Sequence, residues 1–163
     1  MTAQAMIVSS VEGPFTEQTW EFESPNVLWM LNYWKNLRGD RARPTWSDID
    51  LLAIHKYARA MTVKDAIDDG ADFLVRYWGT ELSEYLKYDA TGKRVSEYYP
   101  KPGLAVALET HQLALLGNTP TRRWGSSMFS DHGMMKIEMI HLPLDNDAGK
   151  PAHVITLSSF GWG

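Results

Sequence analysis

Apolar residues recur every three or four positions between residues 25 and 38, the spacing of an amphipathic helix. Ser24 is a favourable N-cap, and Pro25 is tolerated at the first helical position. Gly39 supplies the left-handed residue that commonly ends a helix. The positions that form the main apolar side of this predicted helix are Val27, Met30, Leu31, Trp34 and Leu37.

A second apolar side of the same helix carries Leu28, Trp29 and Tyr33. A helix that is apolar on two sides cannot leave both of them in water. We therefore expect one side to cover the protein's own sheet and the other to contact a partner chain. The residues predicted at that interface are Trp29, Tyr33 and Trp34.

The rest of the chain contains apolar runs and alternating positions that are typical of strands. Between the second and third predicted strands, Thr80 can cap a short helix that runs to Leu86, and a longer helix is predicted over residues 104–116. Gly117 ends that longer helix. The five predicted strands cover residues 58–64, 73–78, 121–129, 134–142 and 153–160.

This order of elements predicts an α+β fold, in which a five-stranded antiparallel sheet carries helices on one face and has an N-terminal flanking helix. A chain of 163 residues is of the size of a single domain. We expect an N-terminal tail over residues 1–23, which could instead be a loosely docked strand, a helical flank over residues 24–57, and the core of the domain over residues 58–163.

The gap between the sheet and the longer helix is the predicted ligand site, since small-molecule sites are concave and mostly apolar. Two histidines on these elements can offer polar contacts to a ligand; the alternative is that both are packed histidines, bonded to backbone or water. The residues predicted to line the site are Phe73, Val75, Tyr77, Leu108, His111, Ile137, Met139 and His141.

Composition excludes several classes of function. The sequence has no cysteine, which rules out disulfides, thiolate nucleophiles and cysteine-ligated zinc. A net charge of -4 with scattered Lys and Arg argues against nucleic-acid binding, which needs a basic face. No apolar run approaches about 18 residues, and no signal-peptide pattern is visible. We therefore expect a cytoplasmic protein that binds neither nucleic acid nor membrane.

An ordered set of short motifs runs through the predicted elements. It comprises Tyr33-Trp34, Leu37-Arg38-Gly39, Pro44, Asp48-Ile49-Asp50, Phe73, Arg76, Gly79-Thr80 and Thr91-Gly92. In this order the set resembles a family of stand-alone PAS-like sensor domains of alphaproteobacteria. The resemblance implies a PAS-like five-stranded antiparallel sheet with a helical flank, used for sensing or for protein association. One departure follows Asp50, where that family has prolines and this chain does not.

The resemblance also makes His111 a candidate haem ligand, because PAS-like haem sensors carry their iron ligand on this helical flank. The alternative is a histidine at the edge of the core. Nothing else in the sequence identifies a cofactor. A hydrolase of the nucleophile-elbow type is not indicated, since no Gly-x-Ser-x-Gly motif occurs.

Three functions follow from these observations. The first is a PAS-like sensory domain with no output domain in the chain, which binds a small apolar or amphipathic molecule and signals through a partner protein, most simply as a homodimer. The second is a ligand-free association module with a filled core. The third is a small isomerase-like enzyme, which needs a polar pocket with a carboxylate of raised pKa. We expect the first, with no catalytic or metal site.

Overall fold

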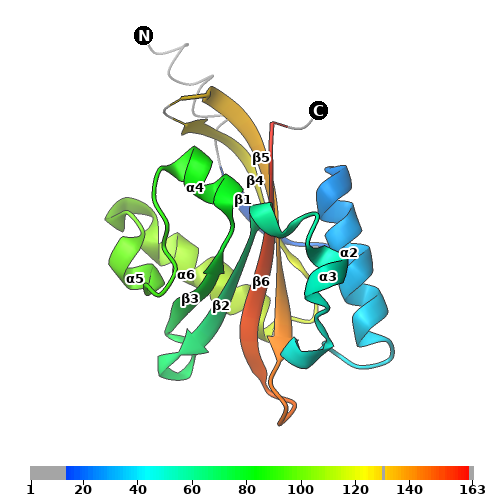
Figure 1. Ribbon diagram of the computed structural model, residues 1–163. Helices are drawn as coiled ribbons and strands as arrows, with labels where there is room; N and C mark the ends of the chain where they lie inside the picture. Colours follow the sequence, from blue (N-terminus) through cyan, green and yellow to red (C-terminus); the bar gives the residue numbers. More distant parts are fainter. Residues whose placement is uncertain (1–13, 130, 162–163) are drawn as a thin grey trace.

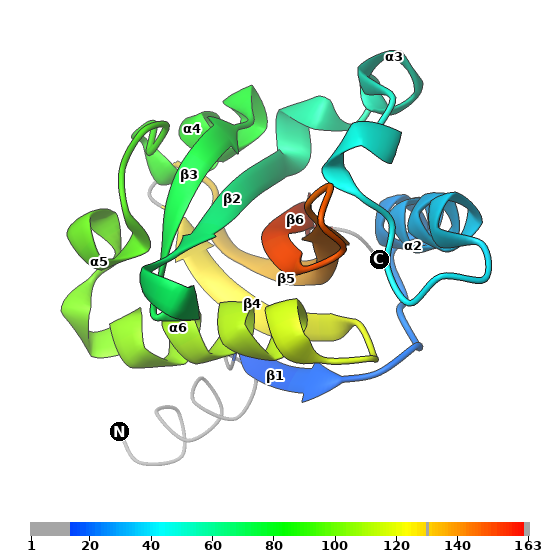
Figure 2. The ribbon, with the colours of Figure 1, turned by 90° about the horizontal axis from the view of Figure 1, so that it is seen from below.

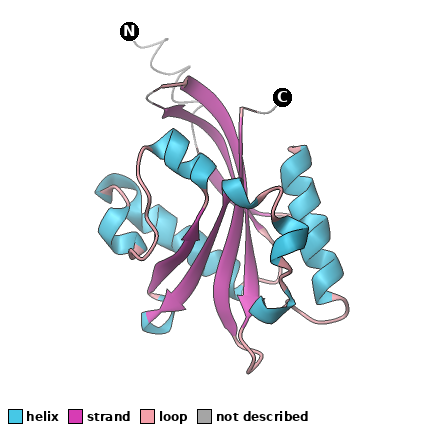
Figure 3. Ribbon diagram, in the orientation of Figure 1, coloured by secondary structure: helices cyan, strands magenta, loops and turns pink. Residues whose placement is uncertain are grey.

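The structure, a computed structural model, describes residues 14–129 and 131–161. Within these residues six strands form one antiparallel sheet, in the order β1-β4-β5-β6-β2-β3 (Figures 1 and 3). The strands are β1 (Phe15–Gln18), β2 (Met61–Ile67), β3 (Asp72–Trp78), β4 (Thr121–Phe129), β5 (Gly133–Asp145) and β6 (Pro151–Phe160). The α-helices are α2 (Pro25–Arg38), α3 (Leu51–Ile54), α4 (Thr80–Leu86), α5 (Val95–Tyr98) and α6 (Lys101–Leu116). Short 3-10 turns occupy Trp46–Asp48 (η1), Ala58–Ala60 (η2) and Asp68–Gly70 (η3).

The predicted α+β class and the antiparallel sheet are confirmed, but the predicted number of five strands is wrong. The sixth strand, β1, lies in the segment expected to be a tail or a loosely docked strand, and it pairs with β4 from Phe15↔Trp124 to Gln18↔Thr121. It was missed because it is only four residues long and mostly exposed. This strand is held at the edge of the sheet by backbone hydrogen bonds to β4. Such bonds do not require apolar side chains, so they leave no pattern in the sequence.

The sheet is covered on both faces. Helix α2 and the segment 46–60 lie against one face, and α4, α5 and α6 lie against the other (Figures 1 and 2). Because successive side chains of a strand point to opposite faces, β5 contributes to both layers. Ile140, Leu142 and Leu144 join the core under α2, whereas Ile137 and Met139 face the layer of α4–α6.

Two buried polar contacts fix α2 on its face of the sheet. At its N-terminus, the carboxylate of Glu138 accepts the backbone N–H groups of Glu23 and Ser24, and the guanidinium of Arg122 donates to the same carboxylate over 2.7 Å. Further along, Trp34 is 2% exposed and donates its indole N–H to the carbonyl oxygen of Pro143 over 2.9 Å. The predicted place of Trp34 at an interface is therefore wrong, because its ring fills the protein's own core.

Gly79 of the Gly-Thr motif connects β3 to α4 at a point where the backbone of η2 passes very close. Its N–H donates to the carbonyl oxygen of Met61 over 2.9 Å. A Cβ added at this position would lie 2.1 Å from the carbonyl oxygen of Arg59. The glycine is required for this close approach, since its own φ of -68° is open to any residue.

Replacing Glu138 with Gln should detach the start of α2. The amide leaves the buried guanidinium of Arg122 with weaker partners, and breaking a buried ion pair costs about 3 kcal/mol or more. We expect Glu138→Gln to lower the free energy of unfolding, measured by urea titration, by about 2–4 kcal/mol. Glu109→Gln, at an exposed position on α6, is the matched control and should change it little. Equal stability of both variants would contradict the anchoring role of Glu138.

Candidate ligand-binding site

A cavity of about 370 Å³ lies between the sheet and the helical layer of α4–α6. Its volume is at the lower end of the range typical of small-molecule sites. Side chains from β2, β3, β4, β5, β6 and all three helical segments line it, and within residues 14–129 and 131–161 none of the lining residues is Asp or Glu. The polar and charged lining residues are Thr62, Lys64, Thr110, His111, Arg123, Ser127, His141, Thr156 and Ser158.

The residues predicted for this site divide into three groups. His111, Ile137, Met139 and His141 line the cavity. Phe73, Val75 and Leu108 lie in the hydrophobic clusters of the same layer and support its walls, with the ring of Phe73 5.2 Å from that of His111. Tyr77 lies elsewhere.

The prediction that Tyr77 lines the cavity is wrong because β3 contains a β-bulge. Val63 pairs with Tyr77 but Lys64 pairs with Val75, so Arg76 is an extra residue that opposes none on β2. A bulge of this kind shifts the alternation of a strand by one position. Tyr77 therefore points to the other face, where it is 40% exposed and its hydroxyl donates to the carbonyl oxygen of Ala58.

Trp78 takes the place in the cavity that the sequence assigns to Tyr77. The extra residue Arg76 is held by two contacts to the carboxylate of Asp65, of 3.0 and 2.7 Å. This bidentate ion pair is favourable because the planar guanidinium matches the carboxylate. No sequence signal marks the bulge, since an Arg in this strand also fits an ordinary solvent-facing position.

One row of side chains with hydrogen-bonding groups crosses the sheet on the cavity side. Register places these residues directly opposite one another on five neighbouring strands. Opposite residues of antiparallel strands share a face. The row consists, from β3 to β4, of Trp78, Thr62, Thr156, His141 and Thr121. Sequence analysis found only one of them, because each strand contributes a single residue to the row.

Lys64 is the one lysine that lines the cavity, and it is 4% exposed. Its ammonium donates to the hydroxyl of Thr62 over 3.1 Å. Among the described residues no carboxylate forms an ion pair with it, and burial lowers the pKa of Lys64 to about 7. Sequence analysis missed this residue because a polar residue at the end of a predicted strand usually faces solvent. Here both faces of the sheet are covered.

His111 and His141 lie beside Lys64 with their rings 5.1 Å apart. The Nδ1 of His111 donates to the carbonyl oxygen of Ala107 over 2.7 Å, which leaves a lone pair on Nε2. Burial and the nearby Lys64 lower the pKa of His111 to about 3. The Nδ1 of His141 is 2.8 Å from the hydroxyl of Thr156, and burial holds the pKa of His141 well below its usual value.

Both imidazoles are therefore neutral at pH 7, and each keeps one buried nitrogen for a further contact. Within the described residues, the Nε2 atoms of His111 and His141 and the indole N–H of Trp78 have no hydrogen-bond partner. An unpaired buried polar group costs free energy. Three such groups lie around one cavity, beside a buried ammonium, and each of them leaves a hydrogen-bonding position open.

A family model of the PAS domain matches residues 22–158 of the sequence. The chain belongs to the PAS domain family, whose members are typically sensory. A comparison with curated proteins found no match. No helix in the described parts of the chain is long and apolar enough to cross a membrane.

Three solved structures are similar to this chain to different degrees. An RNA-binding light-oxygen-voltage receptor is 14% identical with a TM-score of 0.52; the match covers 91% of this chain but only 38% of the receptor. A sensory box histidine kinase/response regulator from Burkholderia thailandensis gives 13% identity and a TM-score of 0.39, over 67% of this chain and 81% of that one. A sensory box sensor histidine kinase from Vibrio cholerae gives 14% identity and a TM-score of 0.44, and the match covers 68% of this chain and 89% of the kinase chain. At these identities the likeness to the receptor shows the fold alone.

Replacing Lys64 with Met should stabilise the protein. Lys64 is protonated below about pH 10.5 in the unfolded chain but only below about pH 7 in the folded chain. The free energy of unfolding therefore decreases as the pH falls from 10.5 to 7. We expect Lys64→Met to raise the free energy of unfolding at pH 7 by an amount on the order of 4 kcal/mol.

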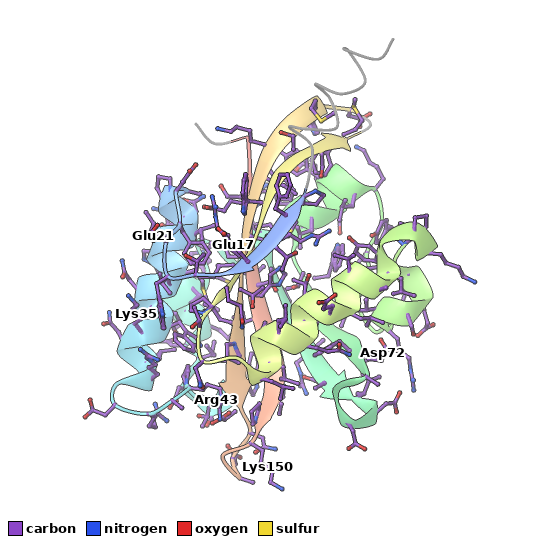
Figure 4. The ribbon with its side chains drawn as sticks, turned by 180° about the vertical axis from the view of Figure 1, so that it is seen from behind. Glu17, Glu21, Lys35, Arg43, Asp72 and Lys150 are labelled. Atoms are coloured by element: carbon purple, nitrogen blue, oxygen red, sulfur yellow. The ribbon has the colours of Figure 1, made fainter. Side chains whose placement is uncertain are left out.

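The gain should shrink as the pH rises towards 10.5, because above that pH the lysine is neutral in both the folded and the unfolded chain. Urea unfolding at pH 7 and pH 10 measures it. Lys150→Met, an exposed lysine on the turn between β5 and β6 at the tip of the sheet (Figure 4), is the control and should leave the stability unchanged. A Lys64→Met variant that is less stable than the parent at pH 7 would show that Lys64 stabilises the fold.

Proposed function

We propose that the protein is a PAS-type sensory domain, which binds a small molecule in the cavity and signals by associating with another protein. The observation that supports this most is the set of buried polar groups around the cavity. A buried lysine with no acidic partner is costly to the fold. Proteins keep such costly groups mainly at functional sites.

The two alternative functions lack the features they need. An association module without a ligand requires a filled core, but side chains of the α4–α6 layer leave a cavity of about 370 Å³. An isomerase-like enzyme requires a carboxylate of raised pKa in the pocket. None of the lining residues is Asp or Glu. The proposal therefore keeps the sensory function.

The sheet itself gives a route from the cavity to α2. His141 and Thr156 face the cavity, and their chain neighbours on β5 and β6 face the other way. Those neighbours, Ile140 and Leu157, are fully buried in the core under α2. A ligand that draws His141 and Thr156 together changes the packing on which α2 rests. Ligand binding then shifts the population of two arrangements of α2.

The surface of α2 and α3 is our proposed site of association, and a second copy of the chain is the proposed partner. Trp29 and Tyr33 are stacked with ring centroids 5.3 Å apart, and Trp29 also contacts Tyr57. These rings are therefore partly covered by the chain itself. Around them the apolar side chains of Leu28, Leu51 and Leu52 are 37%, 66% and 86% exposed. Apolar side chains gathered in this way mark association surfaces.

The ordered motifs also support a narrower proposal, that the chain is one of the PAS-like sensors found in alphaproteobacteria. Leu37-Arg38-Gly39 ends α2, Asp48-Ile49-Asp50 links η1 to α3, and Gly79-Thr80 begins α4. In the structure these motifs shape turns and helix ends. They therefore support a shared fold, and they do not line the cavity.

Native mass spectrometry of the protein purified from its natural source tests the proposed function. We expect a dimer that carries an additional small mass, which is lost on denaturation. A haem would be recognised by its absorbance in the Soret region, and would identify His111 as an iron ligand. A protein without any small-molecule mass, in either its monomeric or dimeric form, contradicts ligand sensing.

Introducing a charge on α3 should dissociate the dimer. In Leu52→Glu a carboxylate replaces the most exposed leucine of the proposed surface, and burying that charge against a second copy is unfavourable. We expect sedimentation velocity to show dimer for the parent and monomer for this variant. Leu116→Glu is the matched control, since Leu116 is 72% exposed on α6, in the helical layer on the other face of the sheet. Dissociation by both variants, or by Leu116→Glu alone, would contradict the proposed surface.

A further inference from the structure

We propose that the ligand of the cavity is a small amphipathic carboxylate, whose carboxylate group is bound among Lys64, His111 and His141 and whose apolar body lies against the aromatic wall beside Trp78. The inference rests on the proposed function, because it assigns a ligand class to the same cavity.

The cavity carries an excess of positive charge that nothing in it balances. Lys64 comes from β2 and the half-buried Arg123 from β4, and both line the cavity. Among the residues that the structure describes, none of those lining the cavity is acidic. A positive group in a buried site attracts an anion far more strongly than it would in water. An anionic ligand therefore balances the positive charge of Lys64 and Arg123 in the cavity.

The free polar atoms match a carboxylate. An ammonium has three donors, and Lys64 uses one of them for the hydroxyl of Thr62. When the hydroxyl of Thr156 donates to Nδ1 of His141, the Nε2 of His141 carries a proton and is a further donor. The two oxygens of a carboxylate can accept these contacts.

His111 adds a proton-linked contact. Its Nδ1 proton is engaged by the carbonyl oxygen of Ala107, so only Nε2 can respond to a ligand. A carboxylate next to this nitrogen favours the imidazolium form. His111 then takes up one proton from water when the anion binds, and it donates to the anion through Nε2.

The opposite part of the cavity is apolar and aromatic. The ring of Trp78 lies 5.6 Å from those of Tyr88 and Tyr98, and Phe160 closes the sheet side. Aromatic rings of this arrangement offer broad apolar contact to a flat or aliphatic group. The ligand is thus a molecule with one charged end, and not a compact inorganic ion.

The polar groups favour a carboxylate over a phosphate. Phosphates in proteins are usually held by several backbone N–H groups at a helix N-terminus or by clustered arginines. The cavity instead offers side chains of strands and of the middle of α6, with one ammonium. A single negative charge suits this set.

Isothermal titration calorimetry with matched probes tests the inference. The probes are phenylacetate and octanoate, each compared with its neutral amide, together with inorganic phosphate. We expect each acid to bind about tenfold or more tightly than its amide, and phosphate to bind more weakly than either acid. If an acid and its amide bind with equal affinity, the cavity binds ligands without distinguishing their charge. This result overturns the inference but leaves the proposed function standing.

A variant at Lys64 tests whether its charge contributes to the binding of acids. Lys64→Met should weaken the acids about tenfold or more and leave the affinity of the amides nearly unchanged. Lys150→Met, at the far tip of the sheet (Figure 4), should leave all affinities unchanged. An unchanged affinity of Lys64→Met for the acids overturns the role of Lys64. If neither acids nor amides bind to the parent, both the inference and the ligand-binding part of the proposed function fail.

The pH dependence of acid binding gives an independent readout. We expect the affinity to fall as the pH rises from 6 to 9, by up to about tenfold per pH unit for each proton that binds with the anion: one on His111 and, above pH 7, one on Lys64. Calorimetry in buffers of different ionisation enthalpy should also show uptake of protons at pH 7. An affinity that stays level between pH 6 and pH 9 overturns the inference. The other titratable and charged side chains that face the same cavity are Tyr88, Tyr98, Tyr99, His111, Arg123 and His141.

Discussion

The buried ammonium of Lys64 is the constraint around which the cavity side of this protein is organised. A lysine on a strand normally reaches water, but β2 lies inside the sheet between β6 and β3 and both faces of the sheet are covered. The ammonium therefore lies in the cavity beside two imidazoles, and the hydroxyl of Thr62 accepts one of its hydrogen bonds. Burial lowers the pKa values of His111 and His141, and the charges of Lys64 and Arg123 lower them further. The row of polar side chains along the sheet follows from the same need for partners.

The two faces of the sheet have different chemistry. The face under α2 is packed with aliphatic and aromatic side chains, and its main buried charges, Arg122 and Glu138, satisfy each other. The face under α6 holds polar groups that are not satisfied within the described residues. We infer that the layer under α6 is the less stable of the two layers that share these strands, because unpaired buried polar groups cost free energy. Stability in such a protein is lowered at the site where function needs it.

The sequence was most informative where local rules dominate. The bounds of α2 are those that Ser24 and Gly39 predict, although the hydroxyl of Ser24 donates to Ser159 and does not cap the helix. Helix α4 ends at Leu86 as predicted, but its N-cap is Gly79 and not Thr80. The cavity was placed between the correct layers, and His111 and His141 were found because a histidine is conspicuous on an apolar element. Trp34 was wrongly assigned to the interface because its position in the helix lies between the two apolar sides, and the sequence does not show which side its ring joins.

What the sequence did not reveal depends on contacts between distant segments. The bulge at Arg76 reverses the direction of Tyr77 and Trp78, and nothing in the order of residues marks it. Strand β1 depends on an edge offered by β4. The burial of Lys64 depends on α6, which comes much later in the chain and covers this face of the sheet. Each of these is a tertiary effect that overrides the local pattern.

A crystal structure of the protein with phenylacetate tests the central claim most directly. The account predicts that a carboxylate oxygen lies within hydrogen-bonding distance of the Nζ atom of Lys64, with the phenyl ring against Trp78. A phenylacetate bound with its carboxylate at the mouth of the cavity and its ring beside Lys64, or a cavity filled by the protein's own side chains, would contradict it.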